Sequence, residues 1–175
     1  IGAGWNEEES EAYGFDLGTM EERFDRFEEG LEVIKLLLTQ ERSDFDGDWY
    51  TLTDAMNNPK GPQNPLPICI GGAGLQRTIP AVAKYAHHWN YGSQTMSLQD
   101  FQMRYKVFLR ACDDVGRDPA EITISTILRY SGDISETIQQ AQEFHDAGVH
   151  LGIVSIPKTE DPSIVEKIAE GLPSL

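Results

Sequence analysis

The apolar residues of this chain alternate between short continuous runs and stripes spaced by three or four residues. The stripes predict amphipathic helices, which we place at residues 20–38, 79–86, 98–115, 138–147 and 164–172. The short runs predict strands at residues 67–70, 88–91, 122–127 and 151–156, and we expect the last of these to be buried. The helix at 20–38 is the best defined, because Thr19 and Glu22 form a capping box before it.

Three stretches lack the helical period. Residues 45–52 indicate an extended excursion or a hairpin, and the prolines within residues 57–67 predict an ordered loop without room for a helix. Residues 2–5 have the pattern of a strand end. The chain also lacks an initiator Met, so we expect it to be truncated at its N-terminus.

The alternation of strand and helix predicts βαβ units and a parallel sheet, with about four and a half units in a single domain over residues 1–175. Two architectures fit, a doubly wound sheet and part of an eight-stranded barrel. Periodicity does not separate them. A complete barrel takes about 250 residues, which is more than this chain has.

Composition narrows the range of partners. The chain has 29 acidic and 14 basic residues and a net charge of −15, with no basic cluster, so we expect no nucleic-acid partner. No apolar run reaches the ~18–20 residues of a membrane helix, and no signal peptide is visible. Cys69 and Cys112 both lie in apolar stretches, which favours buried free thiols and a reducing cytoplasm.

The segment Gly71-Gly72-Ala73-Gly74 is the most informative part of the sequence. Glycines directly after a buried strand let the backbone approach an anion, and the following helix adds its positive end, so a phosphate is the natural ligand. Arg77 supports this interpretation. A positive charge near the N-terminus of a helix interacts unfavourably with the helix dipole, and a bound phosphate would offset this cost. The alternative is a turn without a ligand. Pro80 fits the helix if Thr78 is the N-cap.

Other motifs are less specific. The glycine segment is neither a dinucleotide fingerprint nor a P-loop, and no Ser-His-Asp or Cys-His set is visible. His87 and His88 are adjacent and would point to opposite sides of a strand, so we expect no metal site. Small residues at the start of the chain, Ala3 and Gly4, would admit a flat ring that Trp5 could border. Alternatively, Trp5 only covers the mouth of a barrel.

Six segments in order resemble the luciferase-like monooxygenase family, most closely its members that use the deazaflavin coenzyme F-420. The segments are residues 2–14, 22–26, 45–50, 58–60 and 67–72, together with Ala-His-His-Trp-Asn at 86–90. The resemblance implies an α/β fold, namely the C-terminal half of a (β/α)8 TIM barrel from about strand 4 to helix 8. It also implies that the first three and a half βα units are missing before Ile1.

The resemblance implies cofactor-binding residues position by position. Gly71, Gly72, Ala73 and Gly74 match the family's phosphate-holding turn, with Arg77 adjacent. Ala3, Gly4 and Trp5 match the strand end beside the isoalloxazine-type ring, and Tyr13 matches an aromatic residue near the phosphate. Two positions depart from the family. Ser10 replaces a frequent His, and Trp5 replaces an acidic catalytic residue of some deazaflavin dehydrogenases.

We therefore expect an oxidoreductase that transfers hydride between coenzyme F-420 and a small organic substrate. The alternatives are an FMN-dependent monooxygenase of the same fold, and a cofactor-binding or interaction protein without turnover. The catalytic residues stay unassigned, and we expect no metal. A half barrel exposes sheet edges and an inner face, so we expect this half to be stable only with the other half, by self-association or as part of a larger chain. Separately, we expect the full-length protein to be a homo-oligomer.

Overall fold

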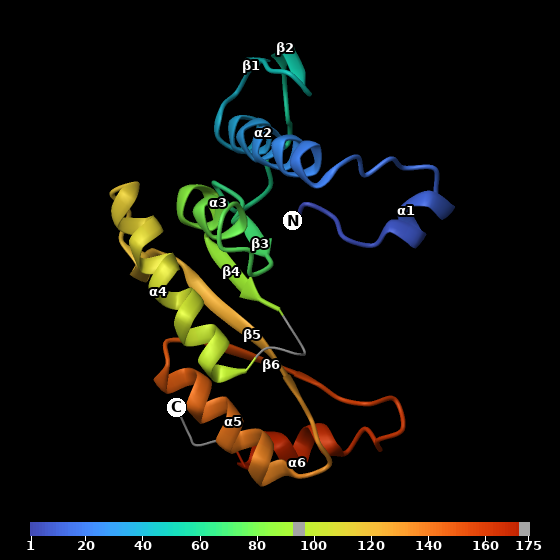
Figure 1. Cartoon of the computed structure of the whole chain (residues 1–175), viewed down its shortest axis with the longest axis vertical. Helices are drawn as coiled ribbons and strands as arrows, with labels where there is room; N and C mark the ends of the chain where they lie inside the picture. Colours follow the sequence, from blue (N-terminus) through green and yellow to red (C-terminus); the bar gives the residue numbers. More distant parts are fainter. Residues whose placement is uncertain (93–96, 172–175) are drawn as a thin grey trace. The chain divides into compact units, whose positions relative to one another are not determined.

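The computed structural model describes residues 1–92 and 97–171, and the chain divides into two compact units, Ile1–Ile70 and Gly71–Leu175 (Figure 1). We refer to them as the N-terminal and the C-terminal unit. Strand β3 (Cys69–Gly71) lies at the boundary.

The N-terminal unit is organised around the long helix α2 (Met20–Thr39), which follows the short helix α1 (Glu7–Ala12). The predicted capping box starts α2. The Thr19 hydroxyl accepts the Glu22 backbone N–H at 3.2 Å, and the Glu22 carboxylate accepts the Thr19 backbone N–H at 2.8 Å. One face of α2 buries Phe27 and Leu31. The prediction of this helix is confirmed.

Residues 43–55 form a hairpin, which was one of the two alternatives that the sequence left open for residues 45–52. Strands β1 (Ser43–Asp46) and β2 (Thr51–Ala55) pair antiparallel, with Phe45 opposite Leu52. After β2 the described residues 56–68 contain no helix, as the prolines predicted. The Lys60 ammonium fixes this loop by donating to the carbonyl of Leu37 at 2.8 Å.

The strand end predicted at residues 2–5 is wrong, because these residues adopt no strand conformation. Gly4 has a φ of +88°, which interrupts an extended backbone. The amino group of Ile1 donates to the Cys69 carbonyl at 2.6 Å, but one hydrogen bond does not form a strand ladder.

The C-terminal unit repeats strand and helix along the chain (Figure 1). Its sheet has the order β3-β4-β5-β6, and the pairs β4–β5 and β5–β6 are parallel, with Asn90 opposite Ser125 and Ile127 opposite Ile153. The parallel sheet predicted from the sequence is confirmed. The elements after β3 are α3 (Thr78–Tyr85), β4 (His88–Tyr91), α4 (Leu98–Asp114), the short 3-10 helix η1 (Pro119–Glu121), β5 (Thr123–Arg129), α5 (Ile134–Asp146), β6 (Leu151–Ser155) and α6 (Ile164–Gly171).

An aromatic cluster between β4 and α4 forms the centre of this unit. Trp89 and Tyr91 of β4 are fully buried, as are Phe101 and Phe108 of α4. The ring centroids of Trp89 and Phe108 are 5.1 Å apart, and those of Tyr91 and Phe101 are 5.0 Å apart, which are favourable distances for aromatic pairs. This cluster fixes the position of β4 and of the glycine turn, which Trp89 contacts through the Gly72 carbonyl.

Three details differ from the predictions. Helix α3 begins at Thr78, so Arg77 and not Thr78 is the N-cap residue. Strand β6 is not buried, because it lies last in the sheet order and its Ile153 side chain is 42% exposed. Cys112 is buried as expected, but Cys69 is only half-buried.

The predicted end of the last helix at residue 172 lies outside the described residues. Within the described ranges, no helix has the length and apolar character needed to cross a membrane.

Candidate functional site

The predicted phosphate turn follows directly from β3. The backbone N–H of Gly72 donates to the Asn90 carbonyl at 3.1 Å, which joins the start of the turn to β4. Gly72 has a φ of +126°, and a Cβ there would lie 3.2 Å from the Thr78 methyl carbon. A Cβ on Gly74 would lie 2.8 Å from the Thr78 hydroxyl oxygen. Backbone conformation requires glycine at position 72, and close packing requires it at position 74.

Gly71 differs from these two glycines. A Cβ built on Gly71 would meet no other atom within 4 Å, and its φ is not positive. Neither packing nor backbone conformation therefore requires glycine at this position. Open space beside the backbone at the end of a strand is what a bound anion would need.

Two side chains that the sequence analysis did not single out hold this turn. The Trp89 indole Nε1 donates to the Gly72 carbonyl at 2.8 Å, and the Arg104 guanidinium Nη1 donates to the Ala73 carbonyl at 3.1 Å. Trp89 belonged to a segment that resembled the family, but nothing in the sequence connected it with the turn. Arg104 gave no signal, since it is one of several charged residues on α4.

The first turn of α3 offers few donors to an anion. The Ile79 N–H already donates to the Gly74 carbonyl at 2.9 Å, the Ala81 N–H donates to the Arg77 carbonyl at 3.1 Å, and Pro80 has no N–H. The Gly72 N–H is also occupied, by the Asn90 carbonyl, so an anion would be bound mainly by the backbone of residues 73–77 and not by the helix itself. Arg77 lies at the end of this stretch and is half-buried.

A polar cluster joins β4 and β5 beside the turn. The Ser125 hydroxyl, fully buried, lies 2.7 Å from His88 Nε2 and accepts the Asn90 side-chain amide at 2.7 Å. Burial lowers the pKa of His88. The pKa of His87 is also lowered, first by burial and then by the Arg117 charge. In the part of the chain that the structure describes, no group of three or more potential metal ligands occurs.

In the N-terminal unit, Arg23 fixes the segment that carries the predicted ring contacts. Its side chain is 7% exposed. Its guanidinium donates to the Gly4 carbonyl at 3.5 Å, to the Gly18 carbonyl at 3.4 Å and to the Glu7 carboxylate at 3.4 Å. One buried guanidinium therefore joins the two ends of residues 4–18, which we call the Trp5 segment.

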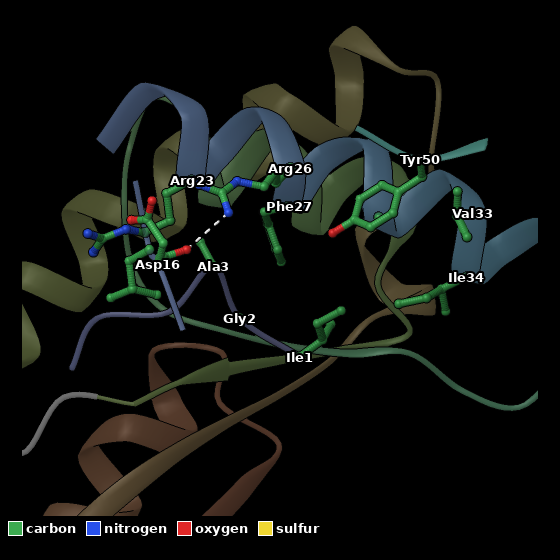
Figure 2. Close-up of a pocket in the computed structure, with 12 residues that line it drawn as sticks. Ile1, Gly2, Ala3, Asp16, Arg23, Arg26, Phe27, Val33, Ile34 and Tyr50 are labelled. Atoms are coloured by element: carbon green, nitrogen blue, oxygen red, sulfur yellow. Dashed lines mark hydrogen bonds between the residues drawn. The ribbon is translucent and has the colours of Figure 1, made fainter. Parts of the chain in front are cut away.

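A cavity of about 350 Å³ lies between the first residues of the chain and α2 (Figure 2). Figure 2 shows Arg23, Arg26 and Asp16 at one end and Tyr50 at the other. The Arg26 guanidinium donates to the Asp16 carbonyl at 3.1 Å. Ala3 is the one predicted ring contact among the described residues that line this cavity. Its apolar lining includes Phe27, Val33 and Ile34.

The other residues of the N-terminal unit that were predicted to contact the cofactor lie on the surface of that unit. Trp5 is 83% exposed and Tyr13 is 74% exposed, and both belong to the Trp5 segment. Gly4 lies beside Leu17, whose side chain would be 3.0 Å from a Cβ at that position. The predicted contacts of Gly4 and Trp5 with the ring, and that of Tyr13 with the phosphate, stay predictions.

Comparisons with known proteins agree on one family and one fold. The model of the luciferase-like monooxygenase family matches residues 1–161. A curated F-420-dependent glucose-6-phosphate dehydrogenase of Kineococcus radiotolerans is 28% identical over an alignment that covers 99% of this chain and 51% of the relative. The chain thus spans about half the length of this curated relative.

Two solved structures resemble this chain across most of its length. One is the coenzyme F-420-dependent tetrahydromethanopterin reductase of Methanopyrus kandleri, with a TM-score of 0.78, 12% identity, and coverage of 97% of this chain and 71% of that one. The other is an F-420-dependent secondary alcohol dehydrogenase, with a TM-score of 0.73, 16% identity, and coverage of 87% and 62%. Both are TIM-barrel enzymes, so the predicted α/β fold as part of such a barrel is confirmed.

Proposed function

The chain belongs to the luciferase-like monooxygenase family, and we propose that it serves an oxidoreductase that transfers hydride between coenzyme F-420 and a small organic substrate. Support comes from curated relatives named F-420-dependent dehydrogenases, one of which aligns with 99% of this chain. Because the chain spans about half the length of that relative, the activity is proposed for the intact protein.

The turn at residues 71–74 carries the proposal. Its start is joined to β4 through the Asn90 carbonyl, its carbonyls at 72 and 73 are held by side chains, and the space beside Gly71 is open. Such a backbone suits the phosphate group of a flavin or deazaflavin. We propose that Gly71, Gly72, Ala73 and Gly74 hold this phosphate and that Arg77 adds a positive charge beside it.

The N-terminal unit contains the other residues that the family resemblance assigns to the cofactor. We propose that Ala3, Gly4 and Trp5 border the ring and that Tyr13 lies near the phosphate. When bound, the deazaflavin supplies the hydride chemistry, and this chain binds and orients it. Trp5 stands where some deazaflavin dehydrogenases have an acidic catalytic residue, and its indole cannot act as that acid. We assign no catalytic acid or base within this chain.

The test is cofactor selection by the intact protein. Purified protein is titrated separately with F-420 and with FMN, and hydride transfer is followed by the absorbance of the deazaflavin. We expect F-420 to bind more tightly and to be reduced or oxidised with an organic substrate. Tight FMN binding with oxygen consumption would establish the monooxygenase alternative, and F-420 binding without turnover on any substrate would establish a binding protein.

A further inference from the structure

Two consecutive carbonyls of the glycine turn, those of Gly72 and Ala73, each accept a hydrogen bond from a side chain of the C-terminal unit. We propose that Trp89 and Arg104 are positioning residues, which orient the peptide planes of the turn so that the amide N–H groups of Ala73 and Gly74 face the anion. This inference rests on the proposed function, because it assigns donors within the proposed phosphate site.

The geometry of the peptide bond supports this assignment. In a planar trans peptide, the C=O of one residue and the N–H of the next point in opposite directions. The Gly72 carbonyl points to the Trp89 indole, so the N–H of Ala73 points away from Trp89. The Ala73 carbonyl points to the Arg104 guanidinium, so the N–H of Gly74 points away from Arg104. Successive N–H groups of this kind form an anion-binding concavity.

Both anchors project from elements of the C-terminal unit's core, and packing fixes Trp89. Trp89 is fully buried, and its ring lies 5.1 Å from that of Phe108 and 6.2 Å from that of Phe101, so the indole cannot turn away from the Gly72 carbonyl without disturbing this cluster. Arg104 projects from α4. The turn is therefore tied to both a strand and a helix of the same core.

Arg104 also contributes its charge. Its bond to the Ala73 carbonyl is charge-assisted, and such bonds are stronger than those between neutral groups. Burial raises the pKa of the neighbouring Tyr91 phenol, while the Arg104 charge acts in the opposite direction. A positive charge behind the turn favours an anion in front of it.

The experiment uses inorganic phosphate as the probe and the intact protein labelled with ¹⁵N. In the wild type, we expect phosphate to shift the amide signals of Ala73 and Gly74. Arg104→Met keeps the aliphatic stem but removes the donor, and Trp89→Phe keeps a ring but removes the indole N–H. Each should weaken phosphate binding about three- to ten-fold, as expected for the loss of one hydrogen bond. Arg104→Lys keeps the charge and a donor and should restore part of the affinity.

The matched control is Arg110→Met, which removes the same charge from an exposed position on α4. An equal loss of affinity in this control would overturn the inference, since the effect would then be general electrostatics. Unchanged affinity in the Arg104 variant, or phosphate shifts confined to other amides, would also overturn it. If Trp89→Phe does not fold, the two Arg104 variants and the control still decide. Phosphate binding at Ala73 and Gly74 without F-420 binding would support this inference while contradicting the proposed cofactor.

Discussion

The methyl carbon of Thr78 lies 3.2 Å from the position that a Cβ on Gly72 would occupy. The neighbouring Gly71 has open space at the corresponding position. Two adjacent glycines in one turn therefore have different reasons to be glycine. Position 72 is constrained by the fold, whereas position 71 is constrained only if a ligand approaches it.

This difference gives the first prediction. Gly72→Ala should lower the free energy of unfolding by about 1–3 kcal/mol, because its φ of +126° is strained for alanine. Gly71→Ala should change that free energy by less than about 0.5 kcal/mol. It should nevertheless weaken F-420 binding about ten-fold, because the new methyl group would occupy the space of the phosphate. Urea unfolding and fluorescence titration measure the two effects. Unchanged F-420 affinity in Gly71→Ala would contradict the proposed phosphate site.

The second prediction concerns the Trp5 segment. Arg23→Met should release it, because one guanidinium bonds to the carbonyls of both Gly4 and Gly18. We expect faster cleavage by protease within residues 4–18 and a loss of about 1–3 kcal/mol in stability. Arg42→Met, which removes an exposed arginine paired with Asp54, is the control. Equal protection of the segment in both variants would show that Arg23 does not hold it.

Glu29 gives a third prediction. Its carboxylate accepts the backbone N–H groups of Asp48, Trp49 and Tyr50, each at 2.8 Å. Glu29→Gln leaves one oxygen acceptor and removes the charge, so the hairpin turn should loosen and stability should fall by about 1–2 kcal/mol. Trp49 fluorescence should change as well, because its ring lies under the Arg26 guanidinium at 4.8 Å. The exposed Glu41→Gln is the control, and the same stability change there would refute a specific role for Glu29.

The fourth prediction is a pH dependence. Burial lowers the pKa of His88 below its ordinary value near 6.5, so the unfolded chain takes up this proton at a higher pH than the folded chain. Stability should be full above about pH 6.5 and should fall as the pH drops below it. His88→Gln should reduce the dependence of stability on pH. Part of this dependence should remain, because the pKa of His87 is lowered too. Thermal unfolding from pH 7.5 to 5.5 measures the slope, with His145→Gln as the control. An unaltered slope in His88→Gln would disprove the assignment.

Local signals explain which elements the sequence predicted well. The capping box at Thr19–Glu22 involves residues three apart, and helix α2 starts where this box predicts. Thr78 was predicted wrongly as an N-cap by the same local logic. Its side chain instead packs beside Gly72 and Gly74, a contact that depends on the path of the preceding turn.

The remaining differences depend on contacts between distant residues. Glu29 looked like any other acid on a helix face, and only the folded hairpin brings the amides of residues 48–50 to it. The apolar run at 151–156 predicted a buried strand, but burial depends on neighbouring strands, and β6 is the last strand of its sheet. The glycine turn was visible as four consecutive residues of the sequence. Its anchors Trp89 and Arg104 were not, because only the fold brings these distant residues to the turn.

The most direct test of the account is the affinity of the intact protein for F-420 compared with FMN, measured by fluorescence titration under identical conditions. The account predicts that F-420 binds more tightly than FMN and that the Gly71→Ala variant loses about ten-fold of this affinity while unfolding like the wild type. Tighter binding of FMN, or F-420 binding that Gly71→Ala does not alter, would contradict it.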